Sequence, residues 1–350
     1  MATITKSIFG TTKQGDTAFS YKIQNNSGAS VTITDFGATI LSLCIPDRQG
    51  NLVDVVLGYD TLEEYEKEGG AYFGSVIGRY GNRIKDGRFV LNGITYELPR
   101  NQEPNHLHGG NTGFSHRLWK TEIKENSLIF SLHSPHMEEG YPANIDVTVT
   151  YQFSDDNVLS IDYYGKSDGD TILNLTNHSY FNLNGHDNGT VNEHWLKLYA
   201  NQYLPTNSVV IPTGELAPVQ GTPFDFTDFT QIGSRIHEDH QQLQYGNGYD
   251  HTYVLHNNGE LLPFAEVYSE QSGITMCGKT TLPGVQFYSG NFLSDERTGK
   301  EKTIYQPRYG FALETQYYPD SINQPHFPSP ILRAGTEYRS TTTYEFSIKK

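Results

Sequence analysis

The chain has 350 residues, of which 36% are hydrophobic, so it can bury a substantial core in one large domain or two ordinary ones. Its formal net charge of −15 disfavours nucleic acid, anionic lipid and strongly anionic substrates as partners. Cys44 and Cys277 are too few for a disulfide framework, and neither a signal peptide nor a run of roughly 20 apolar residues is present. We therefore expect a soluble, cytoplasmic protein.

Short runs of Val, Ile, Thr and Tyr, separated by Gly, Asn and Asp, are typical of an all-β protein. Alternating polarity predicts strands in residues 30–46, 87–99, 144–165 and 335–350. In the second of these, Asn92-Gly93 predicts a two-residue hairpin turn. The chain shows no repeat, linker or change in composition. We expect residues 1–350 to form one large, single-domain antiparallel β-sandwich.

Helical signals are sparse. Residues 61–69 begin with Thr61 followed by Glu64, a capping-box pattern that predicts one short helix. The stretch "GITMCGKT" (273–280) matches a phosphate-binding loop, but the nearby Pro283 prevents the helix that such a loop requires. We interpret it as part of a hairpin that turns at residues 271–273.

"EPNHLHGG" (103–110) places His106 and His108 on one strand face, where a His-x-His pair can bind a metal. Metal-binding barrels that use this pair add a glutamate three or four residues later, and here Asn111 and Thr112 occupy those positions. An ordinary hydrogen-bonding role in a loop and a polar role in a site both remain open.

"NLTNHSYFNLNG" (174–185) carries alternating neutral polar side chains on one strand face: Asn174, Thr176, His178, Tyr180 and Asn182. That face is too polar for a hydrophobic core, and it lacks the Lys and Glu residues that are usual on a solvent-exposed surface without a function. Amides and phenols each supply a donor and an acceptor, and aromatic rings stack on the apolar face of a sugar. The pattern therefore favours a neutral sugar as ligand, with His178 as a candidate catalytic group.

Four further polar residues stand in loops or strands of similar character: Asn82, Arg83, Asp250 and Gln286. Each also fits an ordinary turn or strand. Glu314 lies within the apolar strand "GFALETQYYPD" (310–320) and shares a face with Ala312 and Gln316. A solvated strand face is the plain alternative for Glu314, and only partners elsewhere in the chain could exclude it.

Taken together, these segments resemble the aldose 1-epimerase (galactose mutarotase) family. The matching stretches are "GSVIGRYGNRI", "NHLHGG", "EEGYPA", "NHSYFNLNG", "YDHTYVL", "PGVQFYSGNF" and "ALETQYYPDSINQPHFP". They follow the family order from about residue 30 to the C-terminus. The resemblance implies a galactose mutarotase-like supersandwich with an open cleft, a free aldose such as glucose or galactose as substrate, no cofactor or metal, and a monomer or homodimer.

The resemblance also implies a role for each site residue. Glu314 is the expected general base and His178 the general acid, and His108 binds the sugar and polarises its ring oxygen. Asn82, Arg83, Asp250 and Gln286 match positions that hold sugar hydroxyls. A neighbouring carboxylate is expected to keep His178 charged at neutral pH.

Three other functions remain as alternatives. A glycoside hydrolase could use Asp250 and Glu314 as its two carboxylates. A non-catalytic sugar-binding module could use the same amides and aromatics. A hexose 6-phosphate mutarotase would need more basic residues than Arg83 at the site.

One departure from the family pattern is His136-Met137, where the family usually has Asp-Gly, and we expect it to bear on sugar preference.

Overall fold

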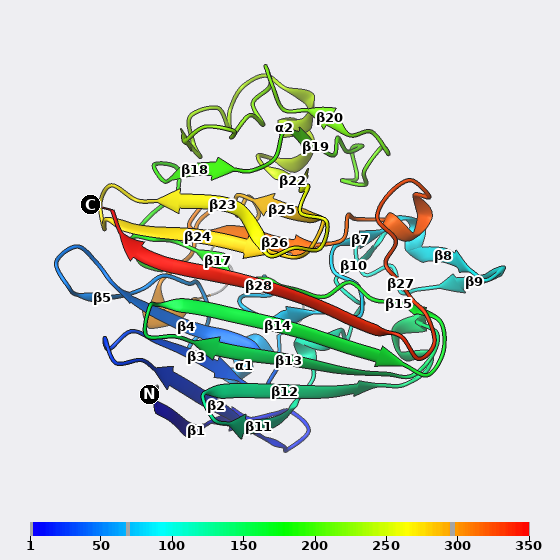
Figure 1. Cartoon of the computed structure of the whole chain (residues 1–350), viewed down its shortest axis with the longest axis horizontal. Helices are drawn as coiled ribbons and strands as arrows, with labels where there is room; N and C mark the ends of the chain where they lie inside the picture. The colour runs from blue at the N-terminus through cyan, green and yellow to red at the C-terminus, as the bar shows by residue number, and fades with distance from the viewer. Residues whose placement is uncertain (1–2, 68–70, 295–297, 350) are drawn as a thin grey trace.

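The protein is described by a computed structural model that covers residues 3–67, 71–294 and 298–349. Within these residues, most strands belong to three antiparallel sheets of five, nine and six strands, which confirms the predicted all-β antiparallel architecture. Figure 1 shows β12, β13, β14 and β28 side by side across the middle of the molecule, with the β8–β9 hairpin projecting at the right.

The five-stranded sheet consists, in spatial order, of β1 (Thr3–Thr11), β2 (Thr17–Gln24), β3 (Ser30–Thr34), β4 (Thr39–Pro46) and β5 (Leu52–Asp54). The nine-stranded sheet consists of β11 (Lys120–Lys124), β12 (Ser127–Ser134), β13 (Ile145–Phe153), β14 (Val158–Ser167), β28 (Glu337–Ile348), β24 (Ile274–Thr280), β23 (Leu262–Tyr268), β18 (Trp195–Leu198) and β21 (Thr230–Gln231). The six-stranded sheet consists of β17 (Tyr180–Phe181), β26 (Phe311–Gln316), β25 (Gly284–Tyr288), β22 (Asp250–Val254), β19 (Gln202–Tyr203) and β20 (Ala217–Pro218).

Shorter elements complete the described chain. The two-stranded ribbons are β10 (His106–Leu107) with β7 (Arg83–Ile84), β15 (Thr171–Ile172) with β27 (Ile331–Leu332), β16 (Thr176–Asn177) with β6 (Val76–Ile77), and β8 (Arg88–Leu91) with β9 (Ile94–Glu97). The helices are α1 (Leu62–Tyr65), α2 (Gln241–Gly246) and the 3₁₀ turns Lys85–Gly87, Phe114–His116, Glu138–Gly140, Lys300–Lys302 and Ser321–Asn323. Neither α-helix in the described residues reaches the length and apolar content that a membrane crossing requires.

The nine-stranded sheet packs its apolar face against the other two large sheets. Alternate residues of β13, from Ile145 to Phe153, are buried, as the sequence pattern predicts. The Tyr151 hydroxyl donates to Ala38 O on the side of the five-stranded sheet, and the Tyr344 hydroxyl donates to Leu313 O of β26. All three sheets contribute to one hydrophobic cluster, so this is a sandwich with a single main core.

The strands of the six-stranded sheet nearest the core differ from β13 because both of their faces are buried. Every residue of β22, β25 and β26 is buried. In β26, Phe311 and Leu313 belong to the hydrophobic core, whereas Glu314 is directed to the opposite face. A strand whose second face is both polar and covered supplies rigid positions for functional side chains.

The local predictions from sequence were largely confirmed. The β8–β9 hairpin turns at Asn92 and Gly93, both with positive φ, and residues 274–280 form a strand rather than a phosphate-binding loop. Helix α1 begins after Thr61 but has only four residues, and the Thr61 side chain makes no capping bond. Residues 68 and 69 of the predicted helix lie outside the described residues. Helix α2 was missed because its N-cap is the His240 imidazole rather than a Ser, Thr, Asp or Asn side chain.

Candidate active site

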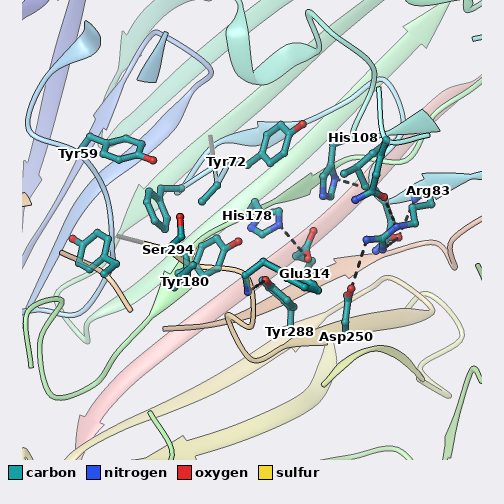
Figure 2. Close-up of a pocket in the computed structure, with 18 residues that line it drawn as sticks. Tyr59, Tyr72, Arg83, His108, His178, Tyr180, Asp250, Tyr288, Ser294 and Glu314 are labelled. Atoms are coloured by element: carbon teal, nitrogen blue, oxygen red, sulfur yellow. Dashed lines mark hydrogen bonds and ion pairs between the residues drawn. The ribbon is translucent and has the colours of Figure 1, made fainter. Parts of the chain in front are cut away.

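A cleft of about 450 Å³ opens over the outer face of the six-stranded sheet (Figure 2). Of the seven residues that the sequence singled out, six line this cleft although they are far apart in the chain: Asn82, Arg83, His108, His178, Asp250 and Glu314. The seventh, Gln286, lies behind Asp250 and is not part of the lining. The fold therefore brings together side chains that the sequence could only predict one motif at a time.

Glu314 and His178 face each other at the centre of the cleft (Figure 2). Oε1 of Glu314 lies 3.5 Å from Nε2 of His178. Glu314 is only 2% exposed and His178 only 4%. A solvated strand face, the plain alternative for Glu314, is thereby excluded.

Backbone contacts fix the two segments that carry this pair. The Asn174 side chain accepts from Tyr317 N at 2.8 Å and donates to Tyr317 O, which ties the strand end after Glu314 to the segment before His178. On the other side, His178 N donates to Ser75 O at 2.9 Å. The separation of the two catalytic candidates is therefore set by the backbone and not by flexible side chains.

Burial moves the pKa values of the pair in opposite directions. Loss of solvent raises the pKa of Glu314 to about 8, with the nearby Asp250 adding to the effect and Arg83 opposing it. The same loss of solvent lowers the pKa of His178 to about 4. The expectation that a carboxylate keeps His178 charged at neutral pH is wrong, because the buried carboxyl group beside it holds the proton instead. Between about pH 4 and about pH 8 the pair carries one proton in total.

This shared proton predicts a bell-shaped pH profile for any acid–base reaction in the cleft. Below about pH 4 the pair gains a second proton and has no base, and above about pH 8 it has no proton to donate. Initial rates measured across this range, corrected for the uncatalysed reaction, should show both limbs. A rate that climbs steadily through pH 8 without an alkaline limb would contradict the assignment.

His108 is held as a neutral hydrogen-bond donor. Its Nδ1 accepts a hydrogen bond from the backbone N–H of Asn82, with the two nitrogens 3.1 Å apart, so the proton of the neutral ring resides on Nε2. Burial, with added repulsion from His178 and Arg83, holds the pKa of His108 well below its usual value. His108 can therefore offer an N–H group to a ligand oxygen but cannot supply a positive charge at neutral pH.

Arg83, Asp250 and Gln286 form a fixed polar arm at one end of the cleft. Arg83 Nε donates to Gln102 Oε1 at 2.7 Å, and its NH2 group lies 3.6 Å from Asp250 Oδ2. Gln286 donates to the other carboxylate oxygen of Asp250 at 2.6 Å. Because Asp250 is held from two sides, it is preorganised to accept hydrogen bonds.

Some lining residues were missed by the sequence reasoning. Gln102 supports Arg83, and the Tyr72 ring lies over the cleft beside His108 and His178. No local pattern identified them, because they stand in loops or strands whose cleft-facing direction depends on the fold. Tyr180 was noticed only as a neighbour of His178.

The polar face predicted for residues 174–182 is only partly a binding surface. His178 and Tyr180 line the cleft, whereas Asn174 and Asn182 are fully buried and donate to backbone carbonyl groups. The segment forms two short pieces, β16 and β17, rather than one continuous strand. These asparagines form hydrogen bonds with backbone groups of irregular segments. The alternation of polar and apolar residues in the sequence could not distinguish this role from sugar binding.

His106 and the His136-Met137 departure also lie away from the cleft lining. His106 is bonded to Pro99 O and to the Tyr141 hydroxyl, each at 2.6 Å, so it does not pair with His108. His136 accepts from Ala143 N in a surface groove, and Met137 is exposed. This loop reaches the site only indirectly, through Glu139, which accepts from backbone amides just after His108.

Three side chains of the types that bind metal ions meet at the centre of the cleft. One ligand atom each from His108, His178 and Glu314 lie within 4.8 Å of one another. The residues that follow His106 and His108 in the chain supply no third ligand, whereas the fold brings His178 and Glu314 to His108. The donor set nevertheless fits a metal poorly, because Nδ1 of His108 already accepts a hydrogen bond and Nε2 carries the proton of the neutral ring, so neither nitrogen offers a free lone pair.

We therefore expect activity to survive exhaustive dialysis against a strong chelator. Rates measured before and after dialysis should agree, because the neutral form of His108 leaves these three side chains unsuited to a metal. Loss of activity that zinc or another divalent ion restores would show that these three side chains hold a required metal.

Comparison with known proteins gives a consistent result. The sequence pattern of the aldose 1-epimerase family matches residues 20–345. The chain is 43% identical over 349 residues to galactose mutarotase from Homo sapiens, covering 99% of this chain and 100% of that protein. It is 39% identical over 329 residues to aldose 1-epimerase from Escherichia coli (strain K12), covering 93% and 94%.

Solved structures agree in fold. An aldose epimerase homologue from C. elegans is 32% identical and superposes with a TM-score of 0.86, covering 94% of this chain and 98% of that one. Galactose 1-epimerase from Lactobacillus acidophilus, at 24% identity, has a TM-score of 0.87 over the full length of both chains. The three large antiparallel sheets are thus the arrangement seen in galactose mutarotase-like proteins.

Proposed function

The chain belongs to the aldose 1-epimerase family and interconverts the α and β anomers of aldoses, and we propose that Glu314 and His178 are the two groups that move the protons. The observation that carries this proposal is the buried contact of 3.5 Å between a carboxyl group and an imidazole in a polar cleft. Anomer exchange needs one group to take a proton and another to give one across a single sugar ring.

The single proton of the pair is sufficient for the reaction. Ring opening starts from the form with the proton on His178: Glu314 takes the proton of the anomeric hydroxyl while His178 gives its proton to the ring oxygen. The C1–O5 bond breaks and the carbonyl group forms, which leaves Glu314 protonated and His178 neutral. Rotation about the C1–C2 bond presents the other face of the aldehyde, and the same transfers in reverse close the ring.

The remaining site residues hold the sugar during these transfers. His108 donates from Nε2 to a sugar oxygen, and Arg83 and Asp250 bind neighbouring hydroxyl groups as donor and acceptor. Asn82 is held beside them, since its side-chain oxygen accepts from Arg83 N at 2.9 Å. Gln286 acts by positioning Asp250 rather than by opening to the cleft. Fixed partners of this kind keep the reacting oxygens near Glu314 and His178 while the open chain rotates.

Galactose is the substrate that the relatives indicate, because mammalian relatives at 42–43% identity are named galactose mutarotases. A phosphorylated sugar fits less well, since Arg83 is the only Lys or Arg among the described residues that line the cleft and it is already paired with Asp250. A hydrolase fits less well too, because Asp250 is bound by Arg83 and Gln286 and is not free to protonate a leaving group.

Polarimetry tests this function directly. Freshly dissolved α-D-galactose and α-D-glucose should reach equilibrium rotation faster with the protein. Methyl glycosides should not change, because they have no proton on the anomeric oxygen for the base to remove. Release of methanol or of reducing sugar from the glycosides would favour hydrolysis instead. Comparing the two free sugars measures the preference for galactose.

We also propose that residues 1–350 act as one aldose 1-epimerase domain. The cleft combines residues from Asn82 to Glu314, and the family pattern spans residues 20–345.

The free thiols of Cys44 and Cys277 suit a reducing compartment such as the cytoplasm.

A further inference from the structure

The ring of His178 lies between two tyrosine rings. The Tyr180 ring is stacked on it with centroids 4.9 Å apart and an angle of 24° between the planes. The Tyr72 ring is also stacked, at 6.0 Å and 27°. Figure 2 shows the three rings together, with Glu314 beside the imidazole. The imidazole is therefore enclosed by π faces while Nε2 stays directed at the carboxyl group.

The position of Tyr72 is maintained against the preference of its own backbone. Its φ of 58° lies in the left-handed region, which a bulky residue rarely adopts and which costs about 1 kcal/mol or more. The loop is bonded to the histidine itself, since Gly74 N donates to His178 O at 3.0 Å and Ser75 O accepts from His178 N. These bonds tie the backbone just after Tyr72 to the backbone of His178.

Aromatic faces have a specific effect on a buried imidazole. Burial disfavours the charged ring, yet ring opening in the proposed function begins with the proton on His178. The negative face of an aromatic ring attracts a cation within about 6 Å of its centroid. Besides Glu314, the ionisable groups that line the cleft around His178 are His108, Tyr72, Tyr180, Tyr288, Arg83 and Asp250.

We propose that Tyr72 and Tyr180 are positioning residues that stabilise the imidazolium form of His178 between their ring faces. This inference rests on the proposed function, in which His178 gives a proton to the ring oxygen. The rings increase the fraction of the pair that has its proton on His178, and they hold Nε2 in line with Glu314. Their hydroxyl groups are not needed for this effect.

Paired substitutions separate the ring face from the hydroxyl group. Tyr72→Leu and Tyr180→Leu should each lower kcat about tenfold with little change in KM. Each variant loses one cation–π contact to the imidazolium, and such a contact away from water corresponds to about a tenfold change in rate. Tyr72→Phe and Tyr180→Phe keep the ring and should retain most of the rate. Tyr72 is only half-buried, so its leucine variant provides a second measurement if the buried Tyr180→Leu variant folds poorly. Equal losses in the leucine and phenylalanine variants would overturn the proposal.

A second readout does not depend on catalysis. With ¹⁵N-labelled histidine and the signal assigned through His178→Asn, NMR follows the protonation of His178 without sugar. The pH at which His178 becomes charged should fall in both leucine variants and stay near the wild-type value in the phenylalanine variants. An unchanged value in the leucine variants would refute the aromatic stabilisation. If His178→Asn keeps full activity, the proposed function fails instead, whatever the NMR titration shows.

Discussion

Replacing Glu314 with glutamine should remove nearly all catalysis, a loss of about 3 to 5 kcal/mol in transition-state stabilisation. Glutamine keeps the size of the side chain and can accept a hydrogen bond, but it cannot take the proton of the anomeric hydroxyl. The position is rigid and buried, so the amide should occupy the same place on β26. Polarimetric kcat and a separate measurement of sugar binding would show the rate lost while the sugar still binds.

Stability measurements provide the first control for Glu314→Gln. The folded-state pKa of Glu314, about 8, exceeds its ordinary value of 4.5, so the folded wild type binds more protons than the unfolded chain between these pH values. The wild type therefore loses stability as the pH rises from about 4.5 to about 8. The variant has no such group and should show the higher Tm above pH 8, with the advantage vanishing in acid. A lower Tm throughout would mean that the lost rate reflects a damaged fold.

Glu345→Gln is a matched control, because it makes the same chemical change on a strand of the nine-stranded sheet. Glu345 is exposed and lies 3.4 Å from Lys279, away from the cleft. Its substitution should leave the rate unchanged. If Glu314→Gln retains more than about a tenth of wild-type turnover, Glu314 is not the base. The rate loss would then be less than about tenfold, whereas a positioned base usually contributes about a hundredfold or more.

Replacing His178 with asparagine should lower kcat by a similar amount, about 3 to 5 kcal/mol. Asparagine preserves a polar group near Glu314 but cannot shuttle a proton to the ring oxygen. Because Glu314 and His178 share one proton, removing the imidazole should also abolish the bell-shaped pH–rate profile. A single limb that reports the ionisation of Glu314 should remain. The same polarimetric assay across pH gives both results.

His133→Asn is the control for this substitution. His133 is an exposed residue of β12, where its Nδ1 is 2.8 Å from Asp146 Oδ1, and its loss should not affect turnover. A His178→Asn variant with near wild-type kcat and an intact bell-shaped profile would assign the acid role to another group, with His108 as the next candidate.

The sequence by itself determined the fold class and the family, and it indicated the candidate site residues. Alternation identified strands β13 and β14, and Asn92-Gly93 identified the β8–β9 hairpin, because these are local consequences of side-chain period and of positive φ. Motifs in the family order nominated Glu314, His178 and His108 before any contact was known. Local patterns could do this because each motif carries its own residue types.

Only the tertiary structure decided how these groups act. The protonation of Glu314 and His178 depends on burial from several directions, which no single strand contains. Alternation could not tell that Asn174 binds backbone carbonyl groups or that Gln286 lies behind Asp250, because both depend on the segment that packs opposite. Tyr72 reaches His178 through a loop with a left-handed residue, a position that long-range packing sets. Side-chain type is encoded locally, whereas solvent exclusion and partner geometry arise only when distant segments meet.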